Sequence, residues 1–339
     1  MTPDFDPERL ARWLDVRFGT ASLTLERIGG GQSNPTYFVT HGAARMVLRK
    51  KPDGPILKGA HAVEREYRVL AALHPAGLPV PRPLVLEEDA AVLGTPFYLM
   101  ERVEGRLFTD CALPQVPKAD RHALWMGLAD ALAALHGVDP GAVGLADFGR
   151  PGDYFQRQLA RWTAQMQASP GPVPGCLRDL AARLPPLLPQ DDGAVSVAHG
   201  DFRLGNVLFH AVEPRVVAIL DWELSTLGHP LADLGFVVMP WHSGPDEYGG
   251  ILGLDHAALG LPSEAEFIAR YRAGRPGVAR LLPFHRAFAM FRFAVIFLGI
   301  ADRARSGTAS GHDAAALAPL AERFAIRATA VLDGPARGA

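Results

Sequence analysis

The run H-G-D-F-R-L-G-N at residues 199–206 is followed by L-D-W-E at residues 220–223. Asp201 comes just after the apolar run VSVA, Asn206 just before VLF, and Asp221 just after VVAIL. Short apolar runs predict buried strands, so all three polar side chains should lie at strand ends, where loops can bring them together. Unpaired polar groups are costly inside a core, and the spacing therefore indicates a site.

A phosphotransfer site needs these residue types in this order. One carboxylate positions the attacking hydroxyl and takes its proton, while an Asn and a second Asp hold Mg²⁺ on the nucleotide phosphates. The pattern H-x-D-x-x-x-x-N, followed by an Asp at the end of a strand, is that set. Two other interpretations stay open. The side chains could cap turns and a helix start, or they could belong to a metal-dependent phosphohydrolase, which would need further His and Asp clusters.

The composition is that of an ordinary globular protein. Its 339 residues suffice for two lobes, and 48% of them are hydrophobic and 21% charged. The net charge of −2 gives no field that would attract nucleic acid or an anionic membrane. Cys111 and Cys176 lie far apart and fit neither a disulfide framework nor a zinc site, as is typical of a reducing compartment.

Nothing in the sequence predicts insertion into a membrane. The N-terminal residues carry early acids and no long apolar core, unlike a signal peptide. The most apolar stretch, residues 287–301, is short for a bilayer and contains Arg292, so it predicts a buried helix. We expect a cytoplasmic protein that binds neither nucleic acid nor a membrane.

The first 103 residues predict a small lobe built on an antiparallel sheet with one helix packed on it. Alternating short runs bounded by Gly, Asn and Pro are typical of such strands, and a helical spacing of apolar residues indicates the helix. A short helix is expected over 7–17 and a longer one over 60–74. The strands are expected near 22–28, 36–40 and 45–50, and within 78–89 and 94–103.

From residue 104 to 339 the pattern becomes mainly helical, so the expected fold class is α+β with two lobes. Short apolar runs around the polar residues predict small buried strands. Loops are expected at 169–175 and 305–312 and a frayed tail at 333–339. The predicted helices cover 118–136, 153–168, 177–188, 263–274 and 283–304.

With these motifs the chain resembles the aminoglycoside phosphotransferase family of kinase-like enzymes, which includes choline kinases. The run HGDFRLGNVLF, with VVAILDWELSTLGHPLADLGF after it, is similar to one branch in particular. That branch contains the kinase-like domain fused to acyl-CoA dehydrogenases in animals and free-standing bacterial relatives. The resemblance covers about residues 20–305 and implies a bilobal protein-kinase-like fold, with a nucleotide-binding lobe at 1–103 and a lobe at 104–339 that carries the catalytic loop and acceptor site.

The resemblance also implies roles for the polar residues. Asp201 would be the catalytic base, and Asn206 and Asp221 would bind the magnesium ion that accompanies ATP or GTP. Asp233 would tie the catalytic loop to the helix that follows it, and His199 would order the loop through hydrogen bonds.

The first lobe should then hold the nucleotide. The turn G-G-G-Q-S-N-P-T-Y at 29–37 lies between two predicted strands, where a phosphate-covering turn belongs. The glycines, Gly31 among them, permit close approach of the backbone, and Ser33 or Asn34 can donate to phosphate oxygens.

Kinases usually place a lysine on the third strand, paired with a glutamate on a helix. Here Arg49 stands at that position and Glu66 would be its partner, although Lys51 lies on the same strand face and stays an alternative. An arginine can bind phosphate in a bidentate manner. Residues 97–103 resemble the hinge, whose backbone around Glu101 and Val103 would bind the base.

Two departures from protein kinases favour a small-molecule enzyme that needs no activating phosphorylation. Gly200 replaces the Arg of H-R-D, so no residue is present to bind an activation-loop phosphate. Trp222 and Glu223 replace the Phe and Gly of D-F-G.

The basic residues near the C-terminus favour an anionic acceptor. Residues 267–300 hold six arginines and no Asp or Glu, whereas a site for polycationic aminoglycosides should be acidic. Arg286 and Arg292 lie in an apolar segment and need anionic partners, and Arg203 in the catalytic loop is a third candidate. We therefore expect a hydroxyacyl thioester of coenzyme A or a hydroxy acid as acceptor. Phosphorylation of an antibiotic, and a nucleotide-binding pseudoenzyme or scaffold, are the alternatives.

Overall fold

The computed structural model describes residues 3–29, 34–53, 62–150, 152–306 and 317–334. The chain forms two compact units. The first comprises Met1–Gly105 together with Val217–Leu224, and the second comprises Arg106–Val216 and Ser225–Ala339. The segment that carries Asp221 thus folds with the first unit, although it follows the catalytic loop in sequence.

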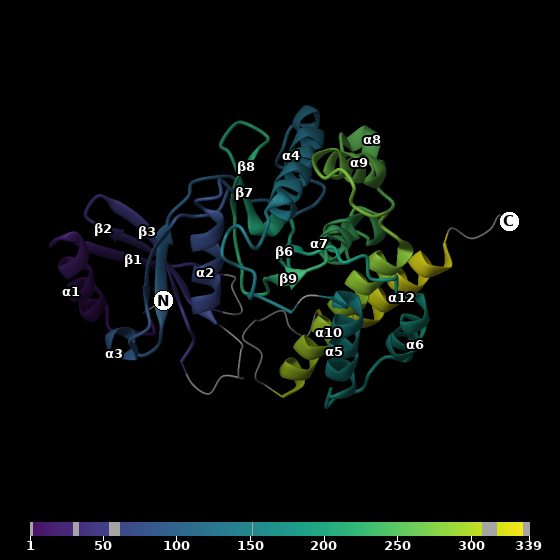
Figure 1. Cartoon of the computed structure of the whole chain (residues 1–339), viewed down its shortest axis with the longest axis horizontal. Helices are drawn as coiled ribbons and strands as arrows, with labels where there is room; N and C mark the ends of the chain where they lie inside the picture. Colours follow the sequence, from purple (N-terminus) through teal and green to yellow (C-terminus); the bar gives the residue numbers. More distant parts are fainter. Residues whose placement is uncertain (1–2, 30–33, 54–61, 151, 307–316, 335–339) are drawn as a thin grey trace. The chain divides into compact units, whose positions relative to one another are not determined.

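The first unit contains a five-stranded sheet in the order β1-β2-β3-β5-β4, in which all neighbours run antiparallel (Figure 1). The strands are β1 (Leu23–Arg27), β2 (Thr36–His41), β3 (Ala44–Lys50), β4 (Pro83–Glu87) and β5 (Phe97–Glu101), and the helices are α1 (Pro7–Phe18), α2 (Val63–Leu73) and α3 (Ala90–Leu93). The predicted antiparallel sheet is confirmed.

Helices cover both faces of this sheet. Successive side chains of a strand point to opposite faces. Leu48 packs on one side with Trp13 of α1, whereas Arg49 and its cross-strand neighbour Tyr98 contact Glu66 of α2 on the other. The sequence predicted one packed helix, and the second face is covered by α1. The core on the α1 side consists of Leu10, Trp13, Leu14, Tyr37, Val39, Met46, Leu48, Leu93, Phe97 and Leu99.

The second unit is mainly helical, as predicted. Its short strands are β6 (Ser196–Ala198), which pairs antiparallel with β9 (Thr226–Gly228), and β7 (Val207–Phe209), while β8 (Val216–Ile219) leads into the first unit. Its helices are α4 (Lys118–Gly137), α5 (Tyr154–Gln167), α6 (Gly175–Arg183), α7 (Pro230–Val237), α8 (His256–Leu259), α9 (Glu264–Gly274), α10 (Pro283–Arg305) and α12 (Leu320–Asp333), with 3-10 turns at Pro185–Leu187, Leu204–Asn206 and Met239–His242.

Local sequence explains where several helices begin. Asp6 precedes α1 and its carboxylate accepts the Glu8 N–H at 2.9 Å, with Pro7 at the first helical position. A capping box starts α9: the Ser263 hydroxyl accepts the Glu266 N–H, and the Glu266 carboxylate accepts the Ser263 N–H. Both starts are set by residues that lie within one turn.

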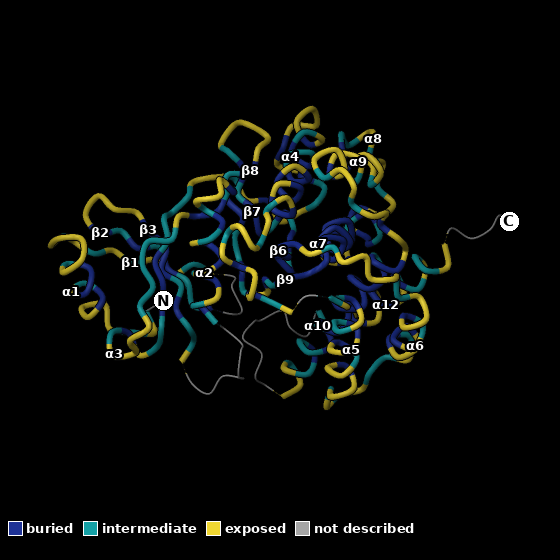
Figure 2. Tube along the Cα trace, viewed as in Figure 1, coloured by how far each residue is buried: buried dark blue, intermediate teal, exposed yellow. Residues whose placement is uncertain are grey.

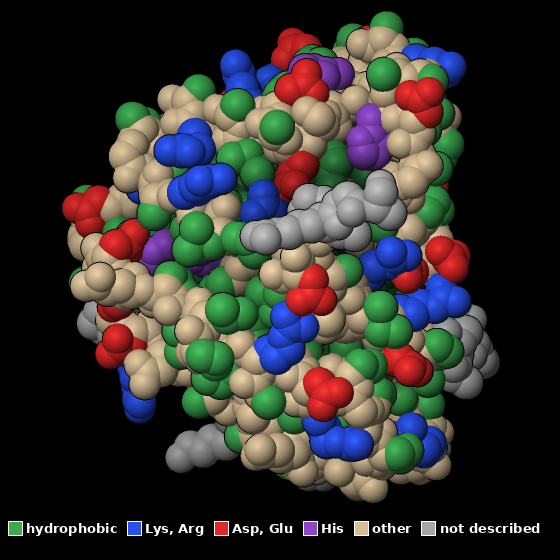
Figure 3. Space-filling view, turned by 90° about the vertical axis from the view of Figure 1, so that its right-hand side faces the viewer, with side chains coloured by type: hydrophobic (Ala, Val, Ile, Leu, Met, Phe, Trp, Pro, Cys, Tyr) green, Lys and Arg blue, Asp and Glu red, His purple; other side chains and the backbone are tan. Residues whose placement is uncertain are grey.

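Helix α10 forms the centre of the second unit and packs against α12, α7 and α5. With 23 residues it is long and apolar enough to cross a membrane, but most of it is buried inside the unit, as the dark segments of Figure 2 show. The predicted buried helix is confirmed, although it extends at both ends beyond the apolar stretch 287–301. On the face drawn in Figure 3, acidic and basic side chains are interspersed and form no large area of one sign.

Candidate active site

The predicted catalytic loop is held in place by hydrogen bonds from its backbone N–H groups. The N–H groups of His199 and Gly200 both donate to the carboxylate of Asp233, at 2.7 and 2.9 Å. Gly200 has a φ of 86°, a left-handed conformation that strains any residue with a Cβ atom. The glycine that replaces the kinase arginine is therefore required by the turn that presents two N–H groups to Asp233.

Asp233 lies on α7 and is 1% exposed. His136 Nε2 lies 3.2 Å from its carboxylate, and His136 Nδ1 lies 2.8 Å from the Tyr271 hydroxyl. Burial raises the pKa of Asp233, but the hydrogen bond and charge of His136 lower it, and the pKa ends below its ordinary value. Asp233 therefore stays ionised and holds the loop. His136 and Tyr271 were not predicted, because their partners are distant in sequence.

Asp201 and Asn206 lie side by side. Asn206 Nδ2 donates to the Asp201 carbonyl at 2.8 Å and to its Oδ2 at 2.7 Å. Arg203 Nε lies 3.4 Å from the same carboxylate oxygen, and the Asp201 N–H donates to His199 Nδ1 at 3.1 Å. Four residues that the sequence assigned to one site thus form one hydrogen-bonded cluster in the second unit.

In the first unit, Arg49 forms ion pairs with three carboxylates. Its Nε lies 2.7 Å from Glu66 and its Nη2 lies 2.6 Å from Asp221, with Glu223 at 3.7 Å. The expected pair of Arg49 with Glu66 is present. Lys51, the alternative cation, lies just beyond the end of β3, and the cation of this strand that contacts Asp221 is Arg49.

Asp221 has a φ of 63°, in the left-handed region that residues other than glycine rarely adopt. The preceding strand is anchored where the Ile219 N–H donates to the Pro79 carbonyl at 2.7 Å. The Trp222 indole donates to the Ile219 carbonyl at 3.0 Å. Strained backbone of this kind persists where the surroundings enforce it, often at functional sites.

Glu66 is oriented by donors from three elements. Besides Arg49, Asn34 Nδ2 donates to it at 2.7 Å and the Tyr98 hydroxyl at 3.1 Å. Burial raises the pKa of Glu66 to about 7, with Arg49 lowering it and the charge of Asp221 raising it. Asn34, which was predicted to donate to phosphate oxygens, instead donates to Glu66 and helps to hold the Arg49–Glu66 pair.

Four residues predicted for the nucleotide site remain to be placed. Gly31 and Ser33 lie outside the described residues. Glu101 ends β5, and its N–H donates to the Arg82 carbonyl at 2.9 Å. Val103 follows two residues later, between the sheet and the end of the first segment of this unit.

The family model for the phosphotransferase enzyme family matches residues 24–284. The chain belongs to this family. A crystal structure from Ralstonia eutropha, provisionally named an aminoglycoside phosphotransferase, has a TM-score of 0.84, 43% identity, and coverage of 96% of this chain and 98% of that one. Macrolide 2'-phosphotransferase type I has a TM-score of 0.63 at 22% identity, covering 94% and 96%, which shows the fold.

The curated relatives that the chain matches are longer than this chain. Acyl-CoA dehydrogenase family member 11 of Gallus gallus is 41% identical over 312 residues, which cover 89% of this chain and 40% of the relative. Family member 10 of Mus musculus is 38% identical, covering 94% and 30%. The chain spans less than half the length of these relatives. As a member of the phosphotransferase family, this domain is an ATP-dependent phosphotransferase that acts on a hydroxyl group.

The predicted acceptor arginines of this phosphotransferase have different surroundings. Arg286 is engaged by the protein: its Nε lies 2.6 Å from Glu264, and it also donates to the Leu281 carbonyl. Arg292 donates to the Gly200 carbonyl and lies over the rings of Trp162 and Phe236. Arg292 therefore braces the catalytic loop, and of the three arginines it is Arg203 that lies beside the Asp201 carboxylate.

Proposed function

We propose that this phosphotransferase moves the γ-phosphate of ATP, or of GTP, to a hydroxyl of an anionic acceptor such as a hydroxyacyl-CoA or a hydroxy acid. The observation that carries the proposal is the cluster around Asp201, in which Asn206 and the cation of Arg203 share one carboxylate oxygen. A base with a fixed positive charge beside it suits an acceptor that carries negative charge.

Asp201 is the proposed base. Its Oδ2 accepts from Asn206 and Arg203, whereas its Oδ1 has no hydrogen-bond partner among the described residues. An oriented carboxylate with one open oxygen can align a hydroxyl and take its proton as the O–P bond forms. Arg292 and Asp233 act indirectly, because they position the backbone of the loop that carries Asp201.

Asn206 and Asp221 are the proposed ligands of Mg²⁺, which neutralises charge on the nucleotide phosphates when it is bound. The donor set fits this ion: Asn206 uses its amide nitrogen for Asp201 and retains its amide oxygen, and Asp221 offers a carboxylate. Among the described residues, no group of three His, Cys, Asp or Glu side chains could hold a metal alone. Mg²⁺ commonly combines one or two protein ligands with phosphates and water.

Two alternatives are weaker. A nucleotide-binding pseudoenzyme would have lost the base or its supports, and here Asp201, Asn206 and the Asp233 contacts are all present. Antibiotic phosphorylation is supported by the name of the Ralstonia eutropha structure, an aminoglycoside phosphotransferase at 43% identity. The fold shared with macrolide 2'-phosphotransferase at 22% identity carries no substrate, and the arginine beside Asp201 favours the anionic acceptor.

A phosphoryl-transfer screen tests the proposal. The purified chain would be given Mg²⁺ and ATP labelled at the γ-phosphate, with hydroxyacyl-CoAs, free hydroxy acids, aminoglycosides and macrolides as separate acceptors. We expect label transfer to the anionic acceptors. Transfer to aminoglycosides alone would reject the anionic acceptor, and nucleotide binding with no transfer to any hydroxyl would favour the pseudoenzyme.

A further inference from the structure

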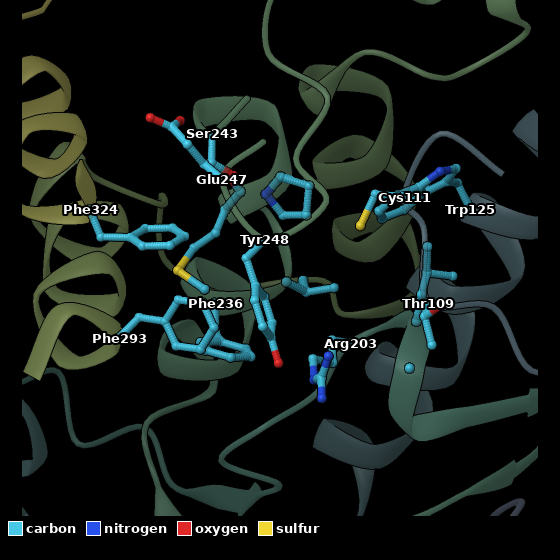
Figure 4. Close-up of a pocket in the computed structure, with 15 residues that line it drawn as sticks. Thr109, Cys111, Trp125, Arg203, Phe236, Ser243, Glu247, Tyr248, Phe293 and Phe324 are labelled. Carbon is cyan, nitrogen blue, oxygen red and sulfur yellow. The ribbon is translucent and has the colours of Figure 1, made fainter. Parts of the chain in front are cut away.

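The second unit contains a small pocket, partly open to solvent, that begins at the catalytic loop (Figure 4). Its wall includes Arg203, Leu204 and Gly205, which lie between Asp201 and Asn206 in sequence. Other parts of the wall come from α7, α10 and α12. The rings that line it are those of Trp125, Phe236, Tyr248, Phe293 and Phe324.

The pocket is apolar, and several of its polar groups are already used by the protein. The Ser243 hydroxyl donates to the Met239 carbonyl at 3.3 Å. Glu247 accepts from Arg327 Nε at 2.9 Å and from the Gly244 N–H at 2.7 Å. The charge of the Glu247 carboxylate is therefore balanced by Arg327. Among the described residues that line the pocket, no other acidic side chain is present to bind a polycation.

Tyr248 lies beside Arg203 in the lining of the pocket. Its ring lies 5.6 Å from the Arg203 guanidinium and 5.2 Å from the Phe293 ring, and Figure 4 shows the polar ends of Tyr248 and Arg203 on the same side. Tyr248 is 44% exposed and has a φ of 65°. A strained, exposed aromatic residue is uncommon and is typical of a position where the side chain has a function.

We propose that this pocket holds the hydrocarbon chain of the acceptor and that Phe324 limits its length. The inference rests on the proposed function, because Arg203 belongs both to the pocket and to the cluster around Asp201. A chain that lies among these rings with its anionic group at Arg203 places its polar end near the base. Phe324 of α12, which is 2% exposed and 4.9 Å from the Phe293 ring, closes the side formed by α10 and α12.

The proposal is tested by binding, without catalysis. Straight-chain saturated fatty acids of increasing length, which have no hydroxyl to phosphorylate, would be titrated calorimetrically into the full chain without nucleotide. Each methylene that enters the pocket should tighten binding roughly fourfold, until the chain meets Phe324 and the gain stops. Affinity that does not depend on chain length would overturn the proposal.

Variants locate the effect. In Phe324→Leu, affinity should go on rising with chain length up to longer chains than in the unmodified protein. Thr109→Trp places a larger side chain in the pocket and should weaken binding of every chain at least tenfold. Ile326→Ala is the matched control, since Ile326 lies on the same helix but is 52% exposed. An unchanged limit in a folded Phe324→Leu variant, or unchanged binding in Thr109→Trp, would contradict the assignment. If hydroxy acids are phosphorylated but chain length has no effect on binding, this pocket assignment fails and the proposed function stands.

Discussion

At the scale of single residues, Asp233 of α7 holds the catalytic loop in place, since its carboxylate accepts two backbone N–H groups of the loop and contacts His136. Asp233→Asn replaces one accepting oxygen by a donor. Hydrogen bonds to charged groups contribute about 1.5–3 kcal/mol each, so the unfolding free energy should fall by at least that amount in urea titrations. Asp246→Asn is the control, because that side chain is 75% exposed. A loss no larger than that of the control would contradict the role.

Arg203 is the residue that should separate the acceptor from the nucleotide. Arg203→Gln removes the cation beside Asp201, and a charge-assisted bond of about 1.5–3 kcal/mol corresponds to roughly 10- to 150-fold in affinity. The acceptor KM should therefore rise far more than the ATP KM in steady-state kinetics. Arg270→Gln removes an arginine that pairs with Asp130 on the surface and should change neither. Equal rises in both constants for Arg203→Gln would remove Arg203 from the acceptor site.

The sequence predicts the contact between Asp201 and Asn206 better than it predicts the residues that hold their loop in place. Asp201 and Asn206 lie five positions apart, and the H-x-D-x-x-x-x-N pattern is local, so their contact could be anticipated. His136 and Tyr271 lie 97 and 135 positions from the partners that they contact. A histidine near the end of a helix gives no local signal of a buried chain of hydrogen bonds, and the fold is needed to reveal it.

At the scale of elements, the start of α10 carries a pH-sensitive group. His285 Nδ1 accepts the Leu282 N–H at 2.8 Å, which requires a neutral ring. Burial and the neighbouring His229 lower the pKa of His285 from 6.5 to about 4. As the pH falls below 6.5, the unfolded chain binds a proton that the folded chain does not, so stability is lost until the pH reaches about 4.

This group should therefore cost up to about 3 kcal/mol of unfolding free energy over that range. His285→Gln keeps an acceptor that cannot titrate, so urea midpoints measured at a series of pH values should fall less steeply on the acid side. His122→Gln, on the surface, is the control. Parallel pH curves for His285→Gln and the unmodified protein would show that His285 is not protonated on unfolding.

Most strands and helices could be predicted because their apolar residues repeat locally. Helix α12 was not predicted, although Phe324 and Ala328 follow Leu320 at four-residue spacing and are buried. Several buried residues of this helix are alanines, whose low hydrophobicity makes the apolar repeat hard to recognise in the sequence. The covering of the second sheet face by α1 also could not be predicted, because it depends on how segments distant in sequence pack.

At the scale of the whole molecule, a contiguous division of the sequence cannot anticipate that Val217–Leu224 folds with the first unit. That segment carries Asp221, the proposed metal ligand that pairs with Arg49. A ligand that binds only the folded chain stabilises it, by about 2.7 kcal/mol at a hundredfold excess over Kd. A non-hydrolysable ATP analogue with Mg²⁺ should therefore raise the Tm.

Removing Mg²⁺ with a chelator should abolish most of this rise, and Asp221→Ala should show little rise at the same concentrations. Thermal melts with and without the metal measure both effects. A rise that is independent of Mg²⁺, or that persists in full in Asp221→Ala, would speak against Asp221 as a metal ligand.

The central claim is that Asp201 acts as the base that takes the proton of the acceptor hydroxyl as the phosphoryl group is transferred to it, and Asp201→Asn tests it most directly. The variant keeps the shape of the side chain and removes its basicity, and general-base catalysis contributes about 10²–10⁴-fold to rate. We expect phosphotransfer to the best acceptor of the screen to fall by at least that range, while calorimetric affinity for the Mg²⁺–nucleotide analogue stays within about twofold of the unmodified protein. Turnover close to that of the unmodified protein would contradict the account.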